Sequence, residues 1–156
     1  MLTLLSRCLS ALLILTAAYA SDQPLPYSHK THVALGLKCS GCHSMPGKGE
    51  MATFPSESLC MGCHVSVKKD SPHIQALAKF AKEKTPVPWK RVYRLPDYVW
   101  FSHKIHMKGA TCEKCHGDVG ARDVVTREKP ITMAACMSCH EETDAPNECN
   151  VCHDQR

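Results

Sequence analysis

The chain has 156 residues, with 11 cysteines, 10 histidines, only two Trp, four Tyr and three Phe, and a formal net charge of +4. This length allows one domain or two very small ones, and the shortage of large side chains beyond residue 20 excludes a large enzyme fold with an ordinary apolar core. Small domains of this composition usually need cross-links or bound groups to be stable, so the cysteines predict disulfides, bound metal or a covalent cofactor.

Residues 1–20 are predicted to form a secretory signal peptide. Arg7 precedes an apolar run, and Ala18-Tyr19-Ala20 has the small-x-small form of a cleavage site, so we expect cleavage after Ala20. The alternative is a retained membrane anchor, although the apolar run is shorter than the ~20 residues that span a bilayer. Cleavage would leave an exported, periplasmic protein with an even number of cysteines.

Five copies of one motif, C-x-x-C-H, contain every cysteine beyond the predicted signal peptide. Two thiols at this spacing can add to the two vinyl groups of one porphyrin, and the adjacent histidine can bind the iron, so each copy predicts one covalently bound haem c. The predicted attachment residues are Cys39, Cys42, Cys60, Cys63, Cys112, Cys115, Cys136, Cys139, Cys149 and Cys152, and the predicted iron ligands are His43, His64, His116, His140 and His153.

Paired cysteines are also typical of two other kinds of small protein. A zinc ribbon uses C-x-x-C pairs, and a small secreted protein can be held by disulfides. Neither requires a histidine directly after the second cysteine of every pair, as all five copies have. The sequence therefore favours five covalently bound haem c groups.

Four further histidines come as two H-x-x-H pairs, each a few residues ahead of a motif. The frames Tyr27-Ser-His-Lys-Thr-His and Phe101-Ser-His-Lys-Ile-His form an internal repeat of an aromatic residue, Ser, His, Lys, any residue and His. Each haem iron has a second axial position that a histidine or methionine can fill. The repeat therefore predicts four more iron ligands: His29, His32, His103 and His106.

Two candidates remain for the fifth second ligand. His73 lies in a short amphipathic helix expected over residues 71–84, with Ser71 as its N-cap and Pro72 in its first turn. Met133 stands three residues before Cys136. Because six candidates serve five positions, one of His73 and Met133 is expected to be spare.

The chain divides into a predicted dihaem module (21–84), a Pro- and aromatic-rich connector (85–101) and a trihaem module (102–156). Porphyrin faces would replace the missing side-chain core through the usual hydrophobic effect. We therefore expect a haem-cored fold that is mostly irregular, with short α-helices and minimal β structure.

The H-x-x-H pair before C-x-x-C-H, with later motifs following closely, resembles the small class III multihaem cytochromes c over nearly all of residues 27–153. The two-plus-three layout, residues 88–103 and Met133 before Cys136 look like the pentahaem part of the cytochrome subunit of alternative complex III and its stand-alone relatives.

This resemblance implies how the second ligands are shared. The first histidine of a pair serves the next haem and the second histidine the one after, which gives His29 with His43, His32 with His64, His103 with His116 and His106 with His140. Met133 takes roughly the slot where the three-haem relatives place a distal histidine for the last haem, here that of His153.

An iron with two protein ligands exchanges electrons but does not readily bind substrate. We therefore expect an electron carrier, not an enzyme, serving a membrane quinol-oxidising complex or a terminal reductase. The alternatives are a nitrite or oxyanion reductase, which needs a haem with a vacant face, and a membrane-anchored quinol dehydrogenase subunit, which needs residues 1–20 retained. Haem propionates would outweigh the positive charge, so no nucleic acid partner is expected.

Overall fold

The computed structural model describes residues 23–46 and 51–153, so the predicted signal peptide over residues 1–20 lies outside the described residues. In the described part, short helices are joined by long irregular segments and no β-strand is formed. One isolated antiparallel bridge joins Val99 to His153. The expected fold class, mostly irregular with short α-helices, is confirmed.

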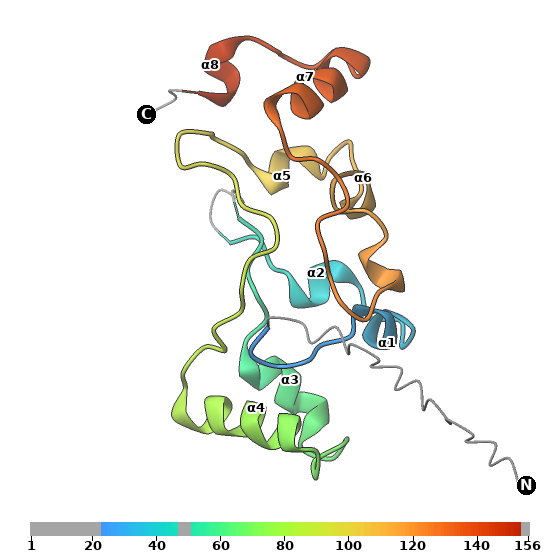
Figure 1. Cartoon of the computed structure of the whole chain (residues 1–156), viewed down its shortest axis with the longest axis vertical. Helices are drawn as coiled ribbons and strands as arrows, with labels where there is room; N and C mark the ends of the chain where they lie inside the picture. The colour runs from blue at the N-terminus through green and yellow to red at the C-terminus, as the bar shows by residue number, and fades with distance from the viewer. Residues whose placement is uncertain (1–22, 47–50, 154–156) are drawn as a thin grey trace, which may run out of the picture.

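The helices lie along an elongated molecule, with α3 and α4 at one end, α7 and α8 at the other, and the rest between them (Figure 1). None of the described helices is both long and apolar enough to cross a bilayer. In chain order they are α1 (His29–Val33), α2 (Cys39–Cys42), α3 (Glu57–His64), α4 (Pro72–Glu83), α5 (His103–His106), α6 (Cys112–His116), the 3₁₀ turn η1 (Val119–Ala121), α7 (Met133–Glu142) and α8 (Cys149–Cys152).

The longest helix, α4, confirms the helix expected over residues 71–84. Ser71 occupies the N-cap position, and Pro72 is the first helical residue, where its missing N–H costs no hydrogen bond. Lys84 ends the helix in the left-handed conformation, at φ 53°. The buried side chain of Leu77 directs α4 against α3 and the start of the connector.

The apolar core is small. In the described part the buried apolar side chains are Leu25, Leu77 and Val87, and the partly buried Phe80 and Trp89 pack against them. Burying three such side chains stabilises a fold by only about 5–9 kcal/mol before the loss of chain entropy is counted. The protein chain alone therefore supplies too little core for its length, as the composition predicts.

The connector over residues 85–101 is tied to the first and the last described segments of the chain. The Gln23 side chain donates to the carbonyl of Lys90 at 2.8 Å and accepts from its N–H at 2.9 Å. Farther along, the N–H of Trp100 donates to the carbonyl of Cys152 at 2.8 Å, beside the Val99 bridge. The β-prone part of the connector thus forms a single bridge and holds α8 in place.

Candidate functional site

Each of the five C-x-x-C-H motifs lies on a helical turn, in α2, α3, α6, α7 and α8. Residues three apart on a helix share one face, with Cβ atoms about 5–6 Å apart. Each turn therefore presents two thiols on one side and a histidine next to them. The ten cysteines of the described residues are all free thiols. This is the arrangement that attachment to two vinyl groups of one porphyrin requires.

Four of the five motif histidines face a histidine from an H-x-x-H pair. Their ring centres lie 6.3 Å apart for His29 and His43, 6.1 Å for His32 and His64, 6.4 Å for His103 and His116, and 6.0 Å for His106 and His140. These are the pairings that the family resemblance implies.

The spacing of these ring pairs fits one metal ion between each pair. A metal–imidazole bond is about 2.0 Å long and the ring centre lies ~1.1 Å beyond the nitrogen, so two imidazoles on opposite sides of one metal have centres roughly 6 Å apart. The four observed distances, from 6.0 to 6.4 Å, agree with this value. The described residues therefore fit a bis-histidine haem iron at four motifs, and the ligand assignment itself stays a prediction.

Hydrogen bonds to backbone carbonyls orient the histidine rings. A carbonyl can only accept, so the Nδ1 atom must carry the proton and Nε2 is left to bind a metal. Nδ1 donates from His43 to Thr53 at 2.8 Å, from His64 to Val67 at 3.0 Å, from His140 to Pro146 at 2.6 Å, from His153 to Tyr98 at 3.2 Å, from His32 to Ser28 at 2.8 Å and from His106 to Ser102 at 2.8 Å.

Two histidines have a lowered pKa because of their surroundings, which favours the neutral imidazole. Burial lowers the pKa of His29, and the neighbouring His43 and His32 lower it further. Burial also lowers the pKa of His116, with His103 and His43 adding to the effect. The neutral imidazole is the form that binds a metal. The Nδ1 atom of His29 is buried and has no hydrogen-bond partner among the described residues.

The hydrogen bond and the ring contact that the structure describes for the fifth motif histidine, His153, are with Tyr98 and not with either candidate second ligand. The ring of His153 stacks on Tyr98, with centres 5.9 Å and planes 30° apart. Met133 opens α7 and is 63% exposed, and His73 is exposed in the first turn of α4. Within residues 23–46 and 51–153, no hydrogen bond or ring contact joins Met133 or His73 to His153. The choice between Met133 and His73 stays open.

The aromatic residue of each repeat frame holds both histidines of its pair. Tyr27 stacks on His32, with centres 4.5 Å and planes 19° apart, and meets His29 edge-on at 4.8 Å. In the second repeat, Phe101 stacks on His106 at 4.3 Å and meets His103 edge-on at 4.8 Å. The sequence repeat contains this aromatic residue but does not by itself indicate its role.

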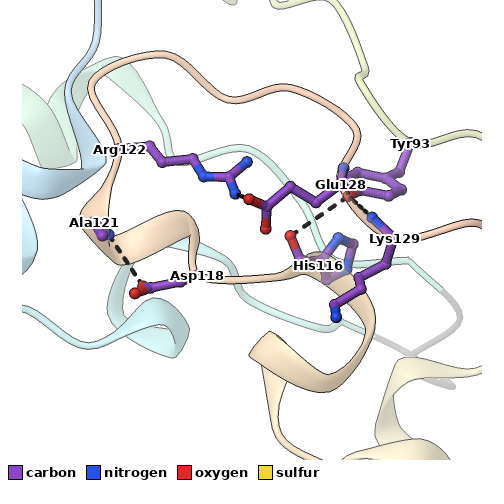
Figure 2. Close-up of polar contacts among 7 residues, drawn as sticks. All are labelled: Tyr93, His116, Asp118, Ala121, Arg122, Glu128 and Lys129. Atoms are coloured by element: carbon purple, nitrogen blue, oxygen red, sulfur yellow. Dashed lines mark hydrogen bonds and ion pairs between the residues drawn. The ribbon is translucent and has the colours of Figure 1, made fainter.

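Tyr93 is a further site residue, which no sequence motif indicates. Its ring meets His116 edge-on, with centres 4.6 Å apart. Its hydroxyl donates to the His116 carbonyl at 3.4 Å and accepts from the N–H of Glu128 at 2.9 Å, and Figure 2 shows it between the helix end and the returning loop. An ion pair between Arg122 and Glu128 closes the same loop (Figure 2). Tyr93 therefore fastens this loop to the third motif.

Large apolar side chains are exposed beside the motifs. Leu35 is 74% exposed between α1 and α2, Leu59 is 50% exposed within α3, Val65 is 66% exposed directly after α3, and Ile105 is 53% exposed within α5. Exposed apolar side chains gathered next to a site mark a surface that an apolar partner covers. The flat, apolar faces of a porphyrin suit this surface.

Comparison with known proteins gives a family match and a similar protein. The family described as cytochrome c7 and related cytochrome c matches residues 99–154. The chain is also similar to a cytochrome c3 from Desulfuromonas acetoxidans, with 33% identity over 55 residues, which are 35% of this chain and 79% of that protein. Three of the five motifs, the second H-x-x-H pair and Met133 fall in the matched region.

Proposed function

Because the chain belongs to the family of cytochrome c7 and related c-type cytochromes, we propose that it is an exported cytochrome with five haems that passes electrons between respiratory redox partners. Proteins of this family are multihaem electron carriers that hold haem c covalently. The number of haems, the export and the partners belong to the proposal. The five C-x-x-C-H motifs support the number, and the predicted signal peptide over residues 1–20 supports export.

The four histidine ring pairs, at 6.0 to 6.4 Å, are the observation that carries the proposal. The motif cysteines would hold each haem by two thioether bonds, and the paired histidines would fill both axial positions of its iron. A haem iron supplies reversible one-electron exchange between Fe(III) and Fe(II). Two histidine ligands would leave no place on the iron for water or substrate, so a haem held in this way would exchange electrons only.

Residue assignments beyond the four pairs also belong to the proposal. Met133 is proposed as the second ligand for the site of His153, because the resemblance places a ligand in that slot, and His73 is then spare. The division into modules over 21–84 and 102–156 is proposed because the family match begins at residue 99, next to the end of the connector.

The proposed partners are a membrane quinol-oxidising complex as donor and a terminal reductase or another redox protein as acceptor. The likeness of residues 88–103 and Met133 to the pentahaem part of the alternative complex III subunit supports a quinol-oxidising complex as the donor. The two ends of the molecule, with α3 and α4 at one and α7 and α8 at the other, lie far apart and leave room for two partners (Figure 1).

Protein produced in a host that matures c-type cytochromes tests the proposal. Voltammetry of the adsorbed holoprotein should show reversible waves that sum to five electrons, and near-infrared magnetic circular dichroism should show bis-histidine haems as the main species. A high-spin haem that binds and reduces nitrite in the resting protein would overturn the carrier function and favour the reductase alternative.

A further inference from the structure

The two copies of the internal repeat lie next to each other at the C-x-x-C-H motif that follows each H-x-x-H pair, in α2 and in α6. Cys39 is the first cysteine of the motif that follows the first H-x-x-H pair, and Cys112 is its counterpart after the second pair. Burial and the neighbouring Cys39 thiol raise the pKa of Cys112, so these two counterpart thiols lie close to each other. His43 and His116 are also counterparts in the repeat. His43 is near enough to His116 to add to the lowering of its pKa that burial causes. Equivalent elements that contact each other form a head-to-head junction, as in a two-fold interface.

Contacts of α1 with the segment after α6 also hold this junction. The N–H of Lys30 in α1 donates to the carbonyl of Arg122 at 2.9 Å, and Ser28, the N-cap of α1, hydrogen-bonds the Asp123 carboxylate at 2.6 Å. A Cβ atom placed on Gly120 would lie 3.4 Å from Cγ1 of Val33, at the end of α1, so α1 and the turn at Gly120 are close neighbours. Helix α1 is therefore held against the segment that directly follows α6, next to the third motif.

The remaining motifs follow outward from the junction on both sides. On the first side, α1 carries His29 and His32 one turn apart. These two histidines face His43 and His64, so the sites of His43 and His64 are adjacent. Cys42 and Cys60, one from each of these two motifs, are also close to each other. On the second side, α5 carries His103 and His106 in the same way, and α6 therefore adjoins α7.

The last motif extends the second side. Cys139 in α7 lies near enough to Cys115 in α6 to add to the effect of burial in raising its pKa. Cys152 in α8 acts in the same way on Cys136 in α7. Figure 1 shows the same succession along the long axis, from α3 through α2 and α6 to α7 and α8.

We propose that the five haem sites form a single file in the order His64, His43, His116, His140, His153, with a head-to-head junction between the sites of His43 and His116. This order exchanges the first two sites relative to their order in the chain. It rests on the proposed function. Haems held at these sites would supply one-electron exchange between Fe(II) and Fe(III), with no proton or bond transferred.

The order decides which sites can receive or deliver electrons at the ends. A partner docked near α3 would exchange electrons with the site of His64, and a partner docked near α8 with the site of His153 (Figure 1). The site of His43, although first in the chain, would be interior. Loss of its haem would interrupt the file, whereas loss of the haem at His64 would only shorten it.

Solution NMR of the fully reduced, diamagnetic holoprotein tests the order directly. Each haem is assigned through contacts from its axial imidazoles to the assigned backbone, and nuclear Overhauser effects between porphyrin substituents identify adjacent haems. We expect effects that link the haem of His43 to those of His64 and His116. Effects between the haems of His64 and His116, or their absence between those of His43 and His116, would overturn the order.

Two variants that each remove one terminal haem provide a second measurement. Cys60→Ala/Cys63→Ala should shift the porphyrin methyl signals of the His43 haem alone, and the matched Cys149→Ala/Cys152→Ala those of the His140 haem alone. Shifts of the His116 haem in the first variant would contradict the order. A wild-type protein that binds no haem would instead reject the proposed function, so the two failures are distinguishable.

Discussion

The ring of Tyr27 lies nearly flat on the ring of His32, with centres 4.5 Å and planes 19° apart, and the counterpart Phe101 lies on His106 in the same way. Each aromatic ring also meets the first histidine of its pair edge-on, at 4.8 Å. The two histidines of a pair are thereby held at a steep angle to each other, so each can point to a different haem.

Removing this aromatic ring should loosen both histidines. We expect Tyr27→Ala to destabilise the holoprotein by about 1–3 kcal/mol, since a half-buried ring and its contacts are lost. Tyr27→Phe is the matched control, because the second repeat has Phe101 in the same place, and it should stay within about 0.5 kcal/mol of the wild type. Denaturant unfolding followed at the haem absorption measures both, and equal stability of the two variants would refute the role.

The angles between the paired imidazole planes predict two classes of haem spectrum. The planes are 10° apart for His29 and His43 and 6° for His103 and His116, but 59° for His32 and His64 and 39° for His106 and His140. Two iron d orbitals can overlap with the π systems of the imidazole ligands. Parallel imidazole planes overlap mainly with one of them, which separates the two orbitals in energy, whereas tilted planes overlap with both and leave their energies closer together. Low-temperature EPR should therefore show two low-spin types, with the lowest-field signals from the tilted pairs.

Variants that lack one haem assign these EPR signals. Cys60→Ala/Cys63→Ala should remove a signal of the tilted type, and Cys39→Ala/Cys42→Ala one of the parallel type. The reverse assignment, or one uniform signal from all four bis-histidine haems, would contradict the observed ring angles.

Met133 is tested by its own spectral signature. If its sulfur binds the iron at His153, Met133→Ala should abolish thioether-to-iron charge-transfer absorption, and Met133→His should lower the potential of one haem, since a second histidine favours Fe(III). Met137→Ala, in the same helix, and His73→Ala are the controls and should leave the absorption intact. A band that survives Met133→Ala would exclude Met133 as the ligand.

Gly117 follows His116 with φ +72°, and a Cβ atom there would collide with the Glu128 side chain. Gly117→Ala should therefore destabilise the protein by roughly 1–3 kcal/mol, through backbone strain and displacement of Glu128. Gly36→Ala isolates the backbone part, because Gly36 has φ +83° and open space around it. Gly109→Ala should be nearly neutral. Thermal unfolding compares the three, and an unaffected Gly117→Ala would contradict the observed conformation.

The Tyr93 hydroxyl accepts from the N–H of Glu128 and donates to the carbonyl of His116. Tyr93→Phe keeps the ring against His116 but leaves these backbone groups without that partner, which should cost about 1–2 kcal/mol. Tyr98→Phe is the control, since Tyr98 bonds His153 through its backbone carbonyl. Hydrogen exchange of the Glu128 amide should accelerate only in Tyr93→Phe, and equal exchange in both variants would rule out this role.

Much of the site could be predicted because its chemistry is local in sequence. Cys39, Cys42 and His43 must be close in the chain to attach one porphyrin, so the motif itself predicts which residues form the site. The small apolar core and α4 also follow from local composition and capping. The pairing of His32 with His64 is not local, and it came only with the family resemblance.

The remaining features depend on contacts between distant segments. The acceptors for His43 and His140 are the backbone carbonyls of Thr53 and Pro146, and any residue type supplies a carbonyl. The contact between Cys39 and Cys112 arises from the way two repeats meet, and their shared sequence is equally compatible with a tandem arrangement. Neither feature leaves a signal in one sequence.

The intact mass of the protein from a cytochrome c-maturing host tests the central claim most directly. We expect a chain that begins after Ala20 and carries the added mass of five haems, with no cysteine open to alkylation. A colourless chain with ten reactive thiols, or one whose mass shows zinc in place of haem, would contradict the claim.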